Sequence, residues 1–232
     1  MPNRVVATIE TLRRRIHERF GECGLYRVCS QLREIAELDT RRAVSIGRRY
    51  IFLRLFIVLA LVAGAGVLWR VLTLLDFTTA APDFSSEVQG IEAAANLTLL
   101  TGAAILFLVR LEQRLKRRRA LAALHELRSI VHVIDMHQLT KDPSKFIVGG
   151  NTPSSPPLLL TEFQMTRYLD YCSEMLSLTS KVAVVFGQTL DDVVVGEVVS
   201  DTERVSAGLS QKIWQKIMIV QAAGADASAP AR

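Results

Sequence analysis

Hydrophobic residues concentrate in two long stretches near the middle of the chain, Tyr50–Leu75 and Ala93–Val109. An α-helix needs about 20 mostly apolar residues to cross the hydrocarbon core of a bilayer. The segment between the two stretches, Asp76–Glu92, is short and acidic. The pattern therefore predicts two transmembrane helices, 48–75 and 93–110, joined by an extracytoplasmic loop at 76–92.

The hydrophobic positions before the first span recur at helical spacing. They form two runs, separated by Gly21 and Gly24: Val5, Ile9, Leu12, Ile16 and Phe20, then Leu25, Val28, Leu32 and Ile35. This spacing predicts amphipathic cytoplasmic helices over 1–47. The polar face of the first run is basic, which fits either a membrane surface or packing against other helices, and its interspersed glutamates favour packing.

Neither proline nor glycine interrupts the chain between Ala103 and Pro143, which predicts one continuous helix from about Ala93 to Leu139. Residues 111–140 would then form a helical stalk beyond the second span. An apolar seam along this stalk would pack in a bundle or against another subunit, and it consists of Leu124, Leu127, Val131 and Ile134. A loop rich in proline and glycine is predicted at 141–160.

The segment 161–221 is predicted to form a cytoplasmic helical hairpin. Thr161 and Gln164 have the spacing of a capping box, which marks the start of a helix. The predicted buried face of that helix is Phe163, Tyr168, Cys172, Met175, Leu176 and Val182. The predicted apolar stripe of the last helix, from about Leu190 to Val220, is Val194, Val198, Val205, Leu209, Ile213 and Ile217. The valines within 193–199 leave a short strand open as an alternative, and the tail 222–232 is expected to be disordered.

The distribution of charge gives the predicted hairpin a direction. The segment 76–92 contains no Lys or Arg, whereas residues 1–50 and residues 110–145 each carry a net charge of +5. Because basic residues stay on the cytoplasmic side, both termini are predicted to be cytoplasmic. The expected fold class is therefore an all-α integral membrane protein, multi-pass in a bacterial-type inner membrane, with a two-helix transmembrane hairpin and a helical cytoplasmic bundle.

The basic residues that flank the spans are expected to meet anionic lipid headgroups rather than nucleic acid. The charges predicted to lie at the membrane interfaces are Arg54, Arg70, Arg117, Arg118 and Arg119. The first apolar run begins about 50 residues into the chain and is too long for a cleaved signal peptide, so we expect a retained anchor. The three cysteines, Cys23, Cys29 and Cys172, fall in predicted cytoplasmic segments, where disulfides are rare.

Small and polar residues within the spans predict close helix packing. Ala60 and Gly64 lie four positions apart in the first span, and Thr98 and Gly102 do so in the second. Such pairs let helix backbones approach each other. Asn96, Thr98 and Thr101 make the outer half of the second span polar, which suits a face packed against protein or, alternatively, the lining of a pore.

No catalytic motif is present, and no cofactor is expected. His125, His132 and Asp135 could hold a metal ion from one helix, but two histidines seven residues apart do not match the usual helical zinc site. The segment Asp135–Pro143 resembles a helix terminus that could serve as a recognition corner for a partner.

The sequence therefore favours a non-enzymatic inner-membrane scaffold or accessory subunit that forms homo-oligomers and binds partner proteins through its cytoplasmic helices. An oligomeric ion channel or transport component, with a pore lined by the second span, is the alternative. A metal-dependent sensor or enzyme at the histidine cluster is a third and weaker hypothesis.

Overall fold

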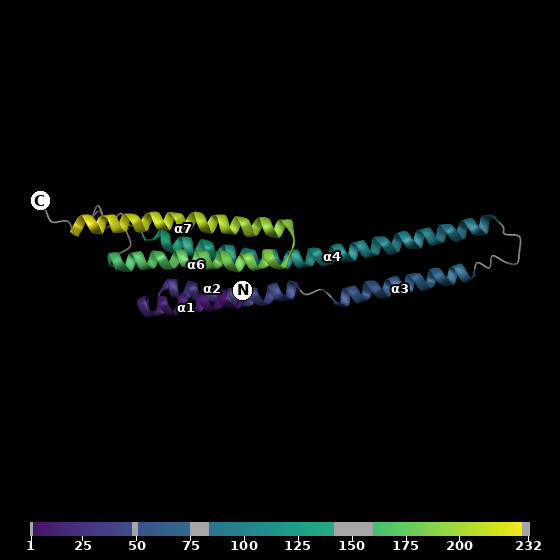
Figure 1. Ribbon diagram of the computed structural model, residues 1–232, viewed down its shortest axis with the longest axis horizontal. Coiled ribbons are helices and arrows are strands. Elements are labelled where there is room, and N and C mark those ends of the chain that lie inside the picture. Colours follow the sequence, from purple (N-terminus) through teal and green to yellow (C-terminus); the bar gives the residue numbers. More distant parts are fainter. Residues whose placement is uncertain (1, 48–50, 75–83, 142–159, 229–232) are drawn as a thin grey trace. The chain divides into compact units, whose positions relative to one another are not determined.

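The computed structural model describes residues 2–47, 51–74, 84–141 and 160–228. Its helices are α1 (Pro2–Phe20), α2 (Gly24–Gly47), α3 (Ile51–Leu74), α4 (Phe84–Leu139), α6 (Glu162–Thr189) and α7 (Val193–Ser228), as Figure 1 shows. No strand occurs in these described ranges, so the predicted all-α class is confirmed. The predicted loops at 76–83 and 142–159 lie outside the described residues.

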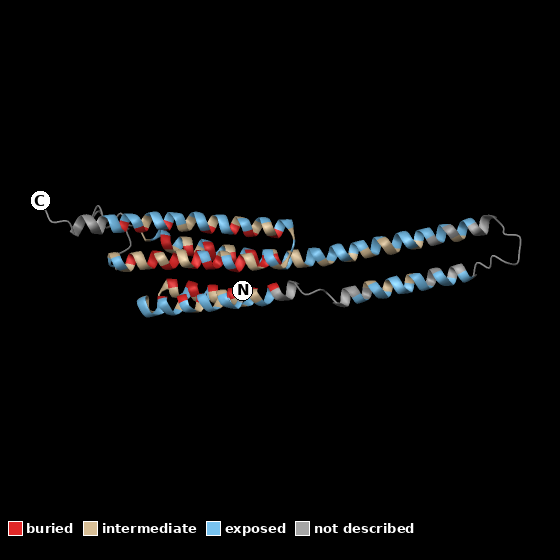
Figure 2. Cartoon of the chain, viewed as in Figure 1, coloured by how far each residue is buried: buried red, intermediate tan, exposed pale blue. Residues whose placement is uncertain are grey.

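The chain divides into two compact units, one formed by residues 1–47 and 117–232 and the other by residues 48–116. The first unit, called the bundle here, contains α1, α2, the last part of α4, α6 and α7. Its core holds the stalk seam and most of the predicted apolar stripes, which Figure 2 shows as buried. Since Leu124, Leu127, Val131 and Ile134 are at most 1% exposed, the core of a single chain already covers this seam.

Contacts between distant parts of the chain show which helices of the bundle pack together. Helices α1 and α6 pack against each other, and Arg15 of α1 forms an ion pair with Glu174 of α6. The contact of α1 with α6 means that the basic amphipathic arm packs on the C-terminal helices, which was the favoured alternative. Arg117–Asp192 and Arg128–Asp201 tie α4 to α7 in parallel register.

Local signals explain most of the helix boundaries. Gly21 has a φ of 64° and donates its N–H to the carbonyl of His17, so this glycine closes α1 in the left-handed conformation that favours glycine. The predicted capping box is confirmed, because the Thr161 hydroxyl accepts from the N–H of Gln164 at 3.2 Å and the Gln164 side chain accepts from the N–H of Thr161 at 3.0 Å.

The start of α7 corrects the strand alternative. The Asp192 carboxylate accepts the N–H groups of Val194 and Val195 at 3.1 and 3.2 Å, which caps a helix where the valines left a strand open. The predicted apolar stripe is only partly right in this half of α7: Val198 and Val205 are half-buried against the core, but Val194 is exposed, and the fully buried valines are Val195 and Val199. The true stripe continues through two buried hydroxyl residues, Thr202 and Ser206, which a search for apolar periodicity passes over.

Three further predictions need correction. Phe163 is 60% exposed, because the first turn of α6 directs it away from the core. The tail predicted to be disordered is helical as far as Ser228, in keeping with the strong helix propensity of its alanines. Residues 84–92, predicted as loop, belong to α4, whose first turn holds the serines and glutamate that favour a helix N-terminus.

The predicted continuous helix is confirmed and is longer than expected, since α4 runs unbroken for 56 residues. In the unit of residues 48–116, α3 and the first part of α4 lie next to each other. A Cβ placed on Gly64 would be 3.7 Å from the Thr101 hydroxyl, in ordinary van der Waals contact. Half-buried residues of the two helices include Ile57, Ala60 and Gly64 on α3, and Leu97, Thr101, Gly102, Ile105 and Leu108 on α4.

Candidate functional site

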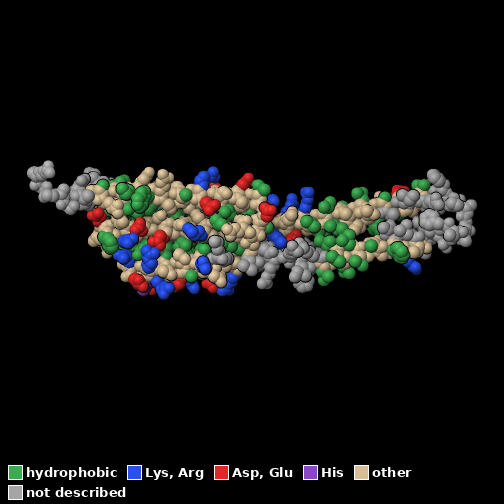
Figure 3. Space-filling model, in the orientation of Figure 1, with side chains coloured by type: hydrophobic (Ala, Val, Ile, Leu, Met, Phe, Trp, Pro, Cys, Tyr) green, Lys and Arg blue, Asp and Glu red, His purple; other side chains and the backbone are tan. Residues whose placement is uncertain are grey.

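The most unusual surface of the molecule is the apolar exterior of α3 and the first part of α4. Large hydrophobic side chains that are 63–72% exposed follow both helices, and they include Leu55, Leu59, Val62, Trp69, Leu99, Leu100, Leu106 and Phe107. Figure 3 shows hydrophobic side chains gathered on this part of the molecule. Soluble proteins rarely expose contiguous apolar patches of more than a few hundred Å².

One described helix is long and apolar enough to cross a membrane: it is α4, within the stretch Val88–Leu139, and its most apolar window is not buried against protein. In α3 the described residues give a shorter apolar stretch, Ile57–Gly66. The bundle, by contrast, contains helices whose apolar stripes are buried.

Of the predicted small residues, Gly64 lies at the contact between α3 and α4. Gly64 faces Thr101 rather than Thr98 or Gly102, and a Cβ on Gly102 would meet no atom within 4 Å. Asn96 and Thr98 are exposed, whereas Thr101 is half-buried against α3.

The predicted interface charges have different environments. Arg117 belongs to the basic segment that follows the apolar stretch of α4. It donates a hydrogen bond to Asp192 at 2.7 Å, so it also holds two segments of the bundle together. Arg118 and Arg119 are exposed, and Arg119 takes part in a further interaction. Arg70 is exposed near the end of α3, and the side chain of Arg54 lies outside the described residues.

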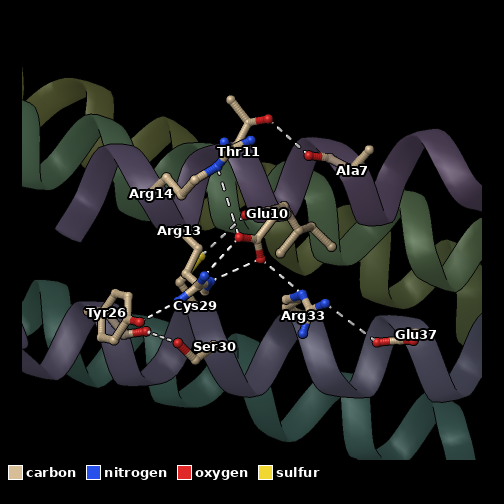
Figure 4. Close-up of polar contacts among 11 residues, drawn as sticks. Ala7, Glu10, Thr11, Arg13, Arg14, Tyr26, Cys29, Ser30, Arg33 and Glu37 are labelled. Carbon is tan, nitrogen blue, oxygen red and sulfur yellow. Dashed lines mark hydrogen bonds and ion pairs between the residues drawn. The ribbon is translucent and has the colours of Figure 1, made fainter. Parts of the chain in front are cut away.

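A charge network joins α1 to α2 (Figure 4), and periodicity alone gave no sign of it. The Glu10 carboxylate accepts from Arg13 at 2.7 and 3.0 Å and forms an ion pair with Arg33 at 2.9 Å. Arg13 also contacts the Tyr26 hydroxyl. The hydrogen bond from Arg13 lowers the pKa of Glu10, so this carboxylate is ionised and holds the two helices together.

Several helices converge at the end of α4, where the recognition corner was predicted, and they cover His137 and Gln138 but leave Met136 and Leu139 exposed. The His137 ring is hydrogen-bonded through Nδ1 to the Tyr168 hydroxyl at 3.2 Å, and it lies directly against Gly24. Lys216 donates to the backbone carbonyl of Gln138 at 2.9 Å, which satisfies one of the last carbonyls of α4. Burial lowers the pKa of His137, so the ring is neutral at pH 7.

These groups are poor candidates for catalysis. Burial raises the pKa of the Cys29 and Cys172 thiols to about 12, whereas a reactive cysteine requires an accessible thiolate. His125 and His132 are exposed on α4, and Asp135 accepts a hydrogen bond from Gln138 at 2.6 Å. Within the described ranges, no three His, Cys, Asp or Glu side chains lie close enough to hold a metal ion.

Two depressions on the bundle lie between α1 and α6. One, of about 440 Å³, is lined by Arg15, Glu18, Arg19, Arg167 and Tyr171. The other, of about 690 Å³, has an apolar floor that includes Val5, Leu178 and Val185. Neither depression was predicted from the sequence, because each combines residues about 150 positions apart, and the helical pattern of either segment gives no signal of the other.

No protein-family model matches this chain, and neither a characterised protein nor a solved structure is significantly similar to it.

Proposed function

We propose that this chain is a non-enzymatic protein of a bacterial-type inner membrane, anchored by a hairpin of α3 and α4. Both termini would be cytoplasmic, and the bundle would act as a scaffold or as an accessory subunit of a larger complex. Anionic headgroups would meet the basic residues that follow the apolar part of α4.

The observation that carries this proposal is the change of environment along α4. Leu99 and Phe107 are 72% and 66% exposed, whereas Leu124 and Leu127 are fully buried in the bundle core. The exposed part spans about 20 residues before Arg110, which is the length that a bilayer requires. The first part of α4 therefore suits contact with lipid, and the last part belongs to a water-soluble helical core.

The partner-binding role of the bundle is supported by its surface. The two depressions between α1 and α6 are open and chemically different, one charged and one apolar. Protein partners recognise such combinations of apolar pockets and charged rims. The buried thiols and the neutral His137 offer no activated nucleophile, which supports a role without catalysis.

The alternative of a channel lined by α4 draws on Asn96, which is polar and exposed. Of the other two polar residues expected in the pore, Thr98 is also exposed, whereas Thr101 lies against Gly64, so packing within the hairpin accounts for Thr101. Conductance of the purified protein in a planar bilayer, and its change in Asn96→Leu, would favour the channel over the scaffold.

Membrane insertion and orientation can be tested with introduced cysteines. We expect Ser86→Cys to react in intact cells with a membrane-impermeant maleimide, and Ser200→Cys, exposed on α7, to react only after lysis. The native Cys29 and Cys172 are buried, and Cys23→Ser in both variants removes the half-buried thiol, so the background is low. Recovery of the chain in the soluble fraction, or labelling of Ser200→Cys in intact cells, would overturn the proposal.

A further inference from the structure

Two charged side chains near one end of the α3–α4 pair have no ion-pair partner among the described residues. Arg70 is exposed near the end of α3, and Glu92 is exposed in the third turn of α4, at the same end of the pair. Asn96, one turn after Glu92, is also exposed and without a hydrogen-bond partner in the described part of the chain. Under the proposed function, all three would lie in or near the outer half of the bilayer.

These groups lie at similar levels along the hairpin. The contact of Gly64 with Thr101 fixes the relative level of the two helices. At about 1.5 Å per residue, Arg70 lies about 9 Å beyond this contact, and on the antiparallel α4 Asn96 and Glu92 lie about 7.5 and 13.5 Å beyond it in the same direction. Arg70 is therefore level with the interval between Asn96 and Glu92.

The same hairpin nevertheless keeps them apart. With about 100° of rotation per residue, Glu92 points about 180° and Asn96 about 140° away from Thr101, the residue that faces α3. Arg70 points about 120° away from Gly64 by the same reckoning. The half-buried residues Leu97, Ile105 and Leu108 agree with this facing, because all three lie on the Thr101 side of α4. The body of α4 thus stands between Arg70 and Glu92 of one chain.

We infer that a second copy of this chain supplies the missing partners: Arg70 of one copy donates to the Glu92 carboxylate and the Asn96 amide oxygen of the next. Charged and amide groups at this depth are costly unless they are paired, and they are found in contact with one another or with protein. The α3 face of one hairpin then meets the outer α4 face of another. Such a heterologous contact generates a ring when its rotation closes.

This inference rests on the proposed membrane hairpin and deepens it. The experiment begins with alkaline carbonate extraction of membranes, followed by native mass spectrometry of the full-length chain in nanodiscs. Arg70→Glu and Glu92→Arg would each weaken self-association, by between about 3-fold and 30-fold for the loss of the interhelical hydrogen bonds alone. The double variant Arg70→Glu/Glu92→Arg should recover the wild-type oligomer.

Mixing the two single variants separates a contact between chains from one within a chain. The Arg70→Glu chain is acidic at both position 70 and position 92, and the Glu92→Arg chain is basic at both. A copy of either variant therefore finds no opposite charge at these positions on another copy of the same variant. In the mixture each chain meets the opposite charge on the other, and mixed oligomers should form more strongly than the oligomers of either variant alone. Arg204→Glu, a change of the same charge on the exposed surface of α7, is the matched control and should leave the mass unchanged.

Each outcome has a distinct meaning. If carbonate releases the chain from the membrane, the proposed function fails. If the chain stays in the membrane but is monomeric, or if the single charge changes leave the oligomer intact, the inference alone fails. If the double variant recovers the oligomer but the mixture of single variants does not, Arg70 and Glu92 pair within one chain, and the inference is overturned. Unchanged circular dichroism of each variant shows that the bundle is folded.

Discussion

Replacement of Gly24 by alanine should destabilise the bundle, although alanine normally favours a helix. Gly24 begins α2, and a Cβ at this position would lie 2.7 Å from Cε1 of the His137 ring. Real Cβ atoms hardly ever approach another heavy atom so closely, so the ring has to move. The ring is held by the hydrogen bond to the Tyr168 hydroxyl, which is on a side chain only 7% exposed.

The opposing energies can be compared. Forced overpacking costs about 1–3 kcal/mol, and a buried hydroxyl that loses its partner costs about 1–3 kcal/mol. The gain in helix propensity from Gly to Ala is at most about 1 kcal/mol, and it is smaller in a first turn. We therefore expect a net loss of at least about 1 kcal/mol, which lowers Tm by about 2–4 °C or more.

The measurement is thermal unfolding of the full chain in detergent, followed by circular dichroism. Gly208→Ala on α7 is the matched control, because a Cβ at that position would meet no atom within 4 Å and the change should raise stability by up to about 1 kcal/mol. In a His137→Ala background the cost of Gly24→Ala should shrink, since the clashing ring is gone. If Gly24→Ala is as favourable as Gly208→Ala, the close packing of His137 on α2 is refuted.

Three further predictions concern titratable groups of the bundle. Burial raises the pKa of Asp39 to about 6 from an ordinary value of 3.8, and one of its oxygens has no hydrogen-bond partner. Because the folded state holds this proton more tightly than the unfolded state, the stability of the bundle should fall as the pH rises from about 4 to about 6. Asp39→Asn should remove this pH dependence and raise Tm at pH 7. An unchanged or lower Tm of Asp39→Asn at pH 7 would contradict this reasoning. Burial is the main cause that lowers the pKa of His137. The folded state therefore disfavours the protonated ring, and the stability of the bundle should decrease as the pH falls below about 6.5. Unfolding curves measured at several pH values should show a smaller decrease for His137→Gln. Asp192→Ala should cost about 1–2 kcal/mol through loss of the α7 cap, whereas Asp191→Ala, a neighbouring change that removes no contact described for α7, should have little effect on Tm.

The sequence alone determined the elements whose signals are local. The capping box at Thr161, the glycine break at Gly21 and the unbroken stretch after Ala103 each depend on residues within one helical turn or on the absence of helix breakers. The apolar stripes of α1 and α2 were also readable, because every third or fourth position is hydrophobic. The predicted two-span hairpin rests on the same kind of evidence, a long run of apolar residues.

Only the tertiary structure decided which faces meet. The buried stripe of the first half of α7 includes Thr202, whose hydroxyl donates to the carbonyl of Val198 and so satisfies itself locally, which makes a polar residue acceptable in the core. The partner of Gly64 is Thr101 because the offset of two antiparallel helices depends on all the side chains along their contact, rather than on one spacing motif. Likewise, His137 could be recognised from the sequence as a helix-end residue, but its contacts are with Gly24, more than 100 positions away, and with Tyr168, more than 30 positions away. Local periodicity fixes where a helix lies and which residues share a face, and long-range packing fixes what that face touches.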